Sequence, residues 1–230
     1  MNPNKTSITI ILDKSGSMQV ARTDTIGGFN SFIEEQKKLP GECEISLIQF
    51  SDESIFTYKS KNIKDLIQGL AQSDYVPNGN TALLDAIGNA IIEKGKELSS
   101  LNEEDRPSKV MFVIITDGQE NASMEYTDIK IKEMIEHQKN VYSWDFTFLG
   151  ANIDTFATSS SLGIDASKSL SFSSNKKGGA VRAFASVNMY AKSARGGSKL
   201  SEASYTDLDR QSNSWTFHKA VLTSNSYRTI

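Results

Sequence analysis

The chain has 230 residues and a formal net charge of −3, with 38% hydrophobic and 23% charged residues. This length and composition suit one α/β domain with a full core, and they exclude an intrinsically disordered chain. A weakly acidic chain without a long Lys or Arg cluster is not expected to bind nucleic acid. No stretch approaches the roughly 20 apolar residues of a membrane-spanning helix, so we expect no membrane association.

The single cysteine, Cys43, excludes an intramolecular disulfide. It lies in an apolar, strand-like run and is interpreted as a small buried hydrophobe rather than a reactive thiol. The first six residues are polar and are not followed by the long apolar segment of a secretory signal. Together these features favour a cytoplasmic protein.

Apolar runs and helical patterns alternate along the chain. Residues 7–12 and 109–116 are near-continuous apolar runs, which is typical of strands covered on both faces of a parallel sheet. The full set of predicted strands is 7–12, 43–50, 55–58, 109–116, 144–149 and 170–172, and the predicted helices are 24–39, 81–98, 127–138 and 179–192.

This alternation predicts an α/β fold. We expect a doubly wound, mostly parallel, open sheet with helices on both faces and a Rossmann-like topology. Residues 55–58 follow the second strand closely and are expected to form one short antiparallel edge strand. In such sheets, ligands bind outside the carboxyl ends of the strands.

The pattern weakens after residue 197, so we predict a domain over residues 1–197 and a C-terminal arm over residues 198–230. The arm is rich in Ser, Thr and Asn, with scattered apolar residues. Residues 215–222 have the composition of one strand. We expect the arm to pack on the domain or on a partner.

Three polar segments fall at the expected ligand edge. The first predicted strand ends in Asp13-Lys14-Ser15-Gly16-Ser17, where Gly16 gives the backbone room to turn so that the two hydroxyls can converge. The most hydrophobic strand ends in Thr116-Asp117-Gly118. The turn Asn78-Gly79-Asn80 leads into Thr81, which either caps the following helix or presents its hydroxyl outward.

The candidate donors are all oxygen atoms: the carboxylates of two aspartates and the hydroxyls of two serines and one threonine. Hard oxygen ligands suit Mg²⁺, with Mn²⁺ or Ca²⁺ as alternatives, whereas Zn²⁺ prefers nitrogen and sulfur. Glu120 and Asn121, which follow the second aspartate, are interpreted as a solvated loop. The predicted metal ligands are Asp13, Ser15, Ser17, Thr81 and Asp117.

This set resembles the metal-ion-dependent adhesion site (MIDAS) of von Willebrand factor type A domains. The family pattern is Asp-x-Ser-x-Ser, a distant Thr and a distant Asp followed by Gly, and this chain supplies every element, over a resemblance that spans roughly residues 6–195. The chain resembles family members that have the complete site and that are of the intracellular bacterial or phage type.

The resemblance implies recognition rather than catalysis. Ser15, Ser17 and Thr81 would coordinate the ion directly, and Asp13 and Asp117 would often act through water. An open coordination position would then accept an Asp or Glu carboxylate from a partner protein. We therefore expect a metal-dependent protein-binding module with no catalytic residues.

Two alternatives stay open. The first is a metal-dependent phosphohydrolase with Asp13 as nucleophile, although the second Asp of the best-known pattern of this kind is Ser15 here. The second is an assembly or structural protein that acts through its C-terminal arm.

Overall fold

The computed structural model describes residues 1–197 and 199–213. The strand predicted over residues 215–222 lies outside these described residues. No described helix is both long and apolar enough to cross a membrane.

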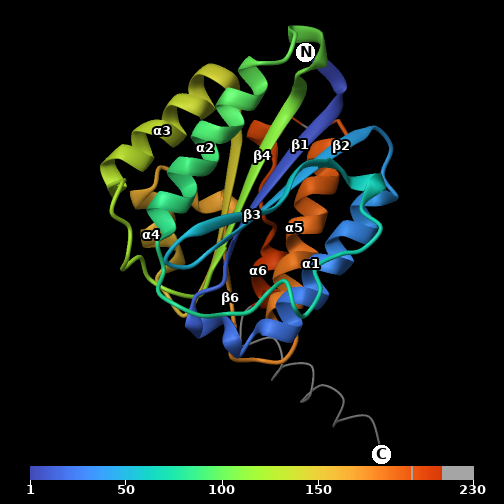
Figure 1. Ribbon diagram of the computed structural model, residues 1–230. Helices are drawn as coiled ribbons and strands as arrows, with labels where there is room; N and C mark the ends of the chain where they lie inside the picture. Colours follow the sequence, from blue (N-terminus) through green and yellow to red (C-terminus); the bar gives the residue numbers. More distant parts are fainter. Residues whose placement is uncertain (198, 214–230) are drawn as a thin grey trace, which may run out of the picture.

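The described strands form one six-stranded sheet in the order β3-β2-β1-β4-β5-β6 (Figure 1). All neighbouring strands are parallel except β2 and β3, which pair antiparallel at one edge. This confirms the predicted sheet and its antiparallel edge strand. The strands are β1 (Asn2–Asp13), β2 (Glu42–Phe50), β3 (Ser54–Asn62), β4 (Pro107–Thr116), β5 (Asp145–Ala151) and β6 (Ser169–Phe172).

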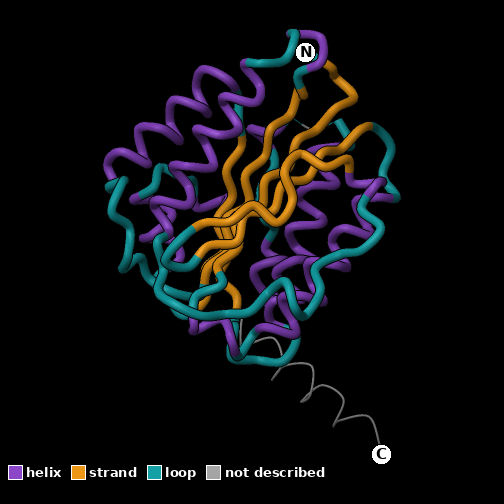
Figure 2. The backbone as a smooth tube through the Cα atoms, viewed as in Figure 1, coloured by secondary structure: helices purple, strands orange, loops and turns teal. Residues whose placement is uncertain are grey.

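Helices cover both faces of the sheet, as Figures 1 and 2 show. One face carries α1 (Arg22–Lys37) and α5 (Gly179–Arg195), which pack against each other. The other face carries α2 (Leu83–Ser99) and α3 (Asp128–Tyr142). Two short helices, α4 (Thr155–Ser161) and α6 (Asp207–Asn213), lie beside β6 and were not predicted.

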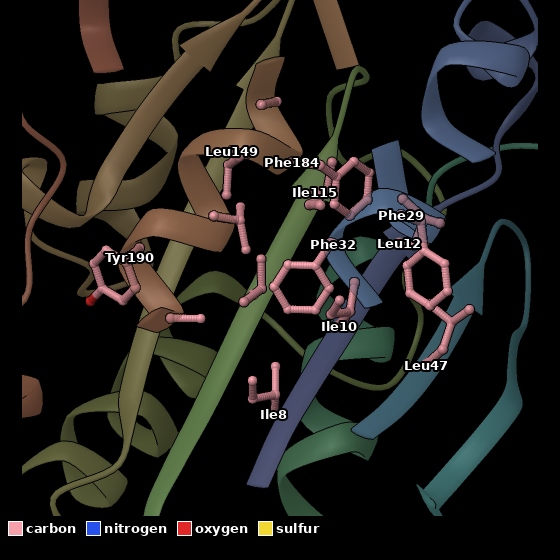
Figure 3. Close-up of a cluster of buried hydrophobic side chains, with 14 of the residues drawn as sticks. Ile8, Ile10, Leu12, Phe29, Phe32, Leu47, Ile115, Leu149, Phe184 and Tyr190 are labelled. Carbon is pink, nitrogen blue, oxygen red and sulfur yellow. The ribbon is translucent and has the colours of Figure 1, made fainter. Parts of the chain in front are cut away.

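The core has two layers because side chains of β1 alternate between the two faces of the sheet. Ile8, Ile10 and Leu12 face α1 and α5, where Phe29 packs edge-on against Phe184 (Figure 3). Ile11 belongs to the opposite layer, with α2 and α3. Burial on both faces explains the near-continuous apolar runs in the sequence.

The first part of the predicted C-terminal arm folds back onto the sheet. Leu200 and Tyr205 are buried, and the Tyr205 amide donates to the Ser167 carbonyl at 2.9 Å. Arg210 of α6 donates to the carbonyl of Ser169 in β6 at 2.8 Å. The boundary between residues 197 and 198 itself stays a prediction.

Candidate metal centre

The strand order places a ligand site next to β1 and β4. The chain leaves β1 for β2 on one side and later returns to β4 on the other, so the order reverses between these two strands. Ligands of open α/β sheets bind at such a reversal, outside the carboxyl ends of the strands. Leu12 pairs with Ile115, so Asp13 and the Thr116-Asp117 segment leave the sheet side by side.

Asp13 is the fully buried end of β1. The Ser15 amide donates to its Oδ1 at 2.6 Å, and the Thr116 hydroxyl donates to its Oδ2 at 2.6 Å. These two bonds fix the carboxylate and tie the β1 loop to the end of β4. The loop then turns through a short 3-10 helix, Gly16–Gln19, before α1 begins.

The two loop serines converge as predicted. The hydroxyls of Ser15 and Ser17 lie 3.1 Å apart, and Ser17 donates to Oδ1 of Asp117 at 2.6 Å. Ser15 and Asp117 are buried, whereas Ser17 is exposed. The two serines therefore place the site between the interior and the surface of the protein.

Thr81 reaches the same point from a third segment. A methyl group built on Gly118 would lie within 4 Å of three of the predicted ligands: Thr81 Oγ1 at 3.1 Å, Ser17 Oγ at 3.7 Å and Asp13 Oδ2 at 3.9 Å. The absent side chain of Gly118 thus leaves a small cradle surrounded by oxygen atoms. All five predicted ligands are brought together.

Backbone contacts align the loop before α2 with the β1 loop. The Gly16 amide donates to the Gly79 carbonyl at 3.1 Å, and the Asn78 amide donates to the Lys14 carbonyl at 2.8 Å. Gly79 has φ +74°, and a Cβ there would collide with Asp52. Glycine is therefore required for the turn that delivers Thr81.

Sequence reasoning missed three supporting side chains. Tyr75 is buried, and its hydroxyl donates to the Asp13 carbonyl at 2.6 Å. Asp52 accepts from the Asn80 side chain at 2.7 Å, and an interaction with the Ser174 side chain partly offsets the rise that burial causes in the pKa of Asp117. These residues are distant from the ligands in sequence and belong to no motif. Only the three-dimensional course of the loops shows that they contact the site.

Glu120 and Asn121 lie in a loop, as predicted, and Asn121 is exposed, but the prediction missed that both side chains support the site. Glu120 accepts from the backbone amide of Leu84 at 3.0 Å, and so satisfies an otherwise unpaired donor in the first turn of α2. Asn121 accepts from the Thr81 amide at 2.9 Å and so holds this predicted ligand. Thr81 is not the helix cap, since Ala82 occupies that position without a side-chain bond.

The electrostatics of the site favour a cation. Burial raises the pKa of Asp13 and also raises the pKa of Asp117, because a charged carboxylate loses its hydration there. Neither carboxylate has a Lys or Arg partner among residues 1–197 and 199–213. Buried carboxylates without a counter-charge are costly, and a divalent ion would offset that cost.

The donor set also fits a hard cation. Within the part of the chain that the structure describes, no three His, Cys, Asp or Glu side chains gather as a metal cluster. The candidate centre has only two carboxylates, so the three hydroxyls must complete it. Oxygen donors with water in the remaining positions match the preference of Mg²⁺.

The fold and the site together define a class: doubly wound α/β domains with a cradle of oxygen atoms where the strand order reverses, between β1 and β4. The family model of the von Willebrand factor type A domain matches residues 7–178. The chain belongs to this family. A search of curated protein sequences finds no match.

Solved structures agree on the fold. The vWF domain of the type V pili tip protein Mfa5 from Porphyromonas gingivalis has a TM-score of 0.61 at 10% identity, over 84% of this chain and 97% of that one. Proximal thread matrix protein 1 from the mussel byssus, solved with a zinc-occupied MIDAS motif, has a TM-score of 0.57 at 15% identity, over 81% and 48%. A von Willebrand factor type A protein from Catenulispora acidiphila has a TM-score of 0.58 at 12% identity, over 82% and 43%. The chain spans less than half the length of the byssus and Catenulispora proteins.

Proposed function

We propose that this chain is a metal-dependent protein-binding module rather than an enzyme. Asp13, Ser15, Ser17, Thr81 and Asp117 would hold a divalent ion, with Mg²⁺ as the first choice and Mn²⁺ or Ca²⁺ as alternatives. The observation that carries the proposal is the convergence of these oxygens beside Gly118, above two buried carboxylates that lack a basic partner. The bound ion would supply an open coordination position for an Asp or Glu carboxylate of a partner protein.

The two aspartates supply charge, and neighbouring residues fix the geometry of the site. Asp13 and Asp117 supply the negative charge that retains a cation, while the neutral hydroxyls leave its charge incompletely balanced. Glu120 and Asn121 hold α2 and Thr81 in place, and Tyr75 holds the end of β1. The ligands are therefore fixed before a partner arrives, which lowers the cost of binding.

Zinc is the principal competitor for the centre, because the byssus protein carries it in its own MIDAS. The absence of nitrogen or sulfur donors among the five ligands favours Mg²⁺ here. We retain a protein partner, rather than nucleic acid or a membrane, and a cytoplasmic location as parts of the proposal.

The geometry argues against the phosphohydrolase alternative. A nucleophilic carboxylate must reach the substrate with a free oxygen. Asp13 is fully buried, so its carboxylate lies out of reach of a substrate phosphate. An assembly role through the C-terminal arm has less support, because residues 199–213 pack on their own domain.

The first test is calorimetric titration of the EDTA-stripped protein with Mg²⁺, Mn²⁺, Ca²⁺ and Zn²⁺. We expect one ion per chain, with binding lost in the double variant Ser15→Ala/Ser17→Ala. The matched control is Ser99→Ala/Ser100→Ala, at the far end of α2, which should bind as the wild type does. Absence of metal binding in the wild type would overturn the proposed centre.

A second measurement tests carboxylate ligation. Water-proton relaxation of the Mn²⁺-loaded protein reports water molecules on the ion. N-acetylaspartate amide should displace water and lower the relaxation rate, whereas N-acetylasparagine amide should not. Equal effects of both probes would contradict a carboxylate-accepting position while leaving metal binding intact.

A further inference from the structure

A pocket lined by several charged residues lies at the end of the sheet opposite the candidate metal centre. It has a volume of about 490 Å³ and opens at the amino ends of β4 and β5. At about 3.3 Å per strand residue, it is separated from Asp117 by roughly 25 Å along β4. Its charged lining residues are Lys109, Lys139, Lys168, Lys199, Asp145 and Asp165. Lys199 also lies 4.0 Å from Glu202, so the ion pairs among the described residues leave one lysine of the lining without a counter-charge.

Two of these lysines are held rigidly. Lys168 is buried and donates to Oδ1 of Asp145 and to the Leu200 carbonyl, the latter at 2.9 Å. Lys139 donates to the Gly163 carbonyl at 2.9 Å and lies 3.2 Å from Asp165. Their ammonium groups are therefore positioned at the pocket without needing to be ordered by a ligand.

Lys109 is the lysine whose charge is not balanced. It is half-buried, and its ammonium donates to the Ala194 carbonyl at the end of α5, which is a neutral acceptor. Among the described residues it forms no ion pair. An ammonium group has three N–H donors, so donors remain for a ligand. Ser108, Ser143 and Ser201 also line the pocket.

We propose that this pocket binds a small oxyanion of the phosphate class. The lining offers what such an anion requires: uncompensated positive charge, fixed ammonium donors and serine residues, which carry neutral hydroxyl donors. The pocket exceeds a single phosphate in volume, which favours a diphosphate or a nucleotide over inorganic phosphate. The site is independent of the metal centre and shares no residue with it.

The test is calorimetric titration with inorganic phosphate, diphosphate and AMP, in EDTA so that no divalent ion participates. Diphosphate should bind saturably and more tightly than phosphate, and the AMP arm distinguishes a free anion from a nucleotide. Lys109→Gln should weaken binding about tenfold, the effect of losing one charge-assisted hydrogen bond. Lys61→Gln, an equal change of charge on exposed β3, should bind as the wild type does.

Two outcomes would overturn the proposal. One is that the wild type shows no saturable binding of any of the three anions up to about 10 mM. This concentration is about ten times a Kd of 1 mM, which is already weak binding. The other is equal weakening in the Lys109 and Lys61 variants, which would indicate general charge attraction. Lys109→Gln also removes a cation from the end of α5, and a lower thermal midpoint would show that the variant is destabilised. In that case Lys139→Gln provides the second test, and it should also weaken diphosphate binding.

Discussion

Gly118 is the residue on which the shape of the metal centre depends most directly. A methyl group there would lie 3.1 Å from the Thr81 hydroxyl oxygen and would fill the cradle between the ligands. We expect Gly118→Ala to weaken Mg²⁺ binding at least about tenfold, which corresponds to roughly 1.4 kcal/mol, while the protein stays folded. Calorimetry and circular dichroism would measure these two properties.

Gly95 supplies the control for that substitution. It lies within α2, and nothing stands within 4 Å of the position its Cβ would occupy. Gly95→Ala should stabilise the helix by about 0.5–1 kcal/mol and leave metal affinity unchanged. Equal metal affinity in both alanine variants would contradict the role assigned to Gly118.

Cys43 offers a separate prediction, on chemical reactivity. Its side chain is buried in β2, and burial raises the pKa of the thiol to about 11. Because the thiolate is the reactive form, native protein at pH 8 should react with iodoacetamide far more slowly than protein unfolded in urea. Mass spectrometry would follow the modification. Rapid labelling of the native state would show that Cys43 is accessible.

The convergence of the five candidate residues could be predicted from local signals in the sequence, whereas their role as ligands stays a prediction. Asp13 ends one apolar strand, Asp117 directly follows another, and Thr81 follows a turn that contains glycine. The supporting residues Tyr75 and Ser174 give no such signal, because their roles depend on the tertiary path of two loops. The metal itself and the partner stay predictions.

At the scale of elements, a partly buried ion pair within α2 is joined to the edge of the sheet through Ser60 of β3, whose hydroxyl bonds to both members of the pair. The Lys94 ammonium group, on the side of α2 near β3, lies 3.0 Å from both carboxylate oxygens of Glu97 and donates to the Ser60 hydroxyl at 2.9 Å. Lys94 is only 4% exposed. Glu97→Gln would leave its charge without a partner, so we expect a loss of about 2 kcal/mol in the free energy of unfolding.

Urea denaturation would measure this loss, and two further variants interpret it. The double variant Lys94→Met/Glu97→Gln should recover much of the stability, because no buried charge then remains. Glu93→Gln removes exposed ion pairs only and should have no measurable effect. A stable Glu97→Gln single variant would mean that water reaches Lys94 in solution.

The elements with strong periodicity were predicted well, and the weak ones were not. The helices predicted over 24–39 and 81–98 correspond to α1 and α2, with ends displaced by two residues or fewer. In contrast, α4 and α6 each have only seven residues, and Leu208 of α6 is exposed. Their contacts with β6, rather than an apolar stripe, hold them in place, and such contacts cannot be read from sequence.

At the scale of the whole molecule, metal binding should raise thermal stability. An ion that binds only the folded chain contributes about 2.7 kcal/mol at a concentration of 100 times its Kd. For a chain of this size, that corresponds to an increase of roughly 5–10 °C in Tm. Differential scanning calorimetry with and without Mg²⁺ would measure it. The Ser15→Ala/Ser17→Ala variant should show no increase, and an equal increase there would indicate a different site.

The two edges of the sheet are both protected against pairing with another strand. The Arg210 guanidinium donates to the Ser169 carbonyl on β6, and the Tyr205 amide donates to the Ser167 carbonyl just before that strand. At the other edge, the pairing of β3 with β2 is broken by register shifts, and Lys59 and Lys61 are exposed along β3. Irregular, lysine-bearing or covered edges are poor templates for β-strand addition. Within residues 1–197 and 199–213, the surfaces that remain for assembly are therefore loops and helices, because neither edge of the sheet favours its extension from one copy to the next.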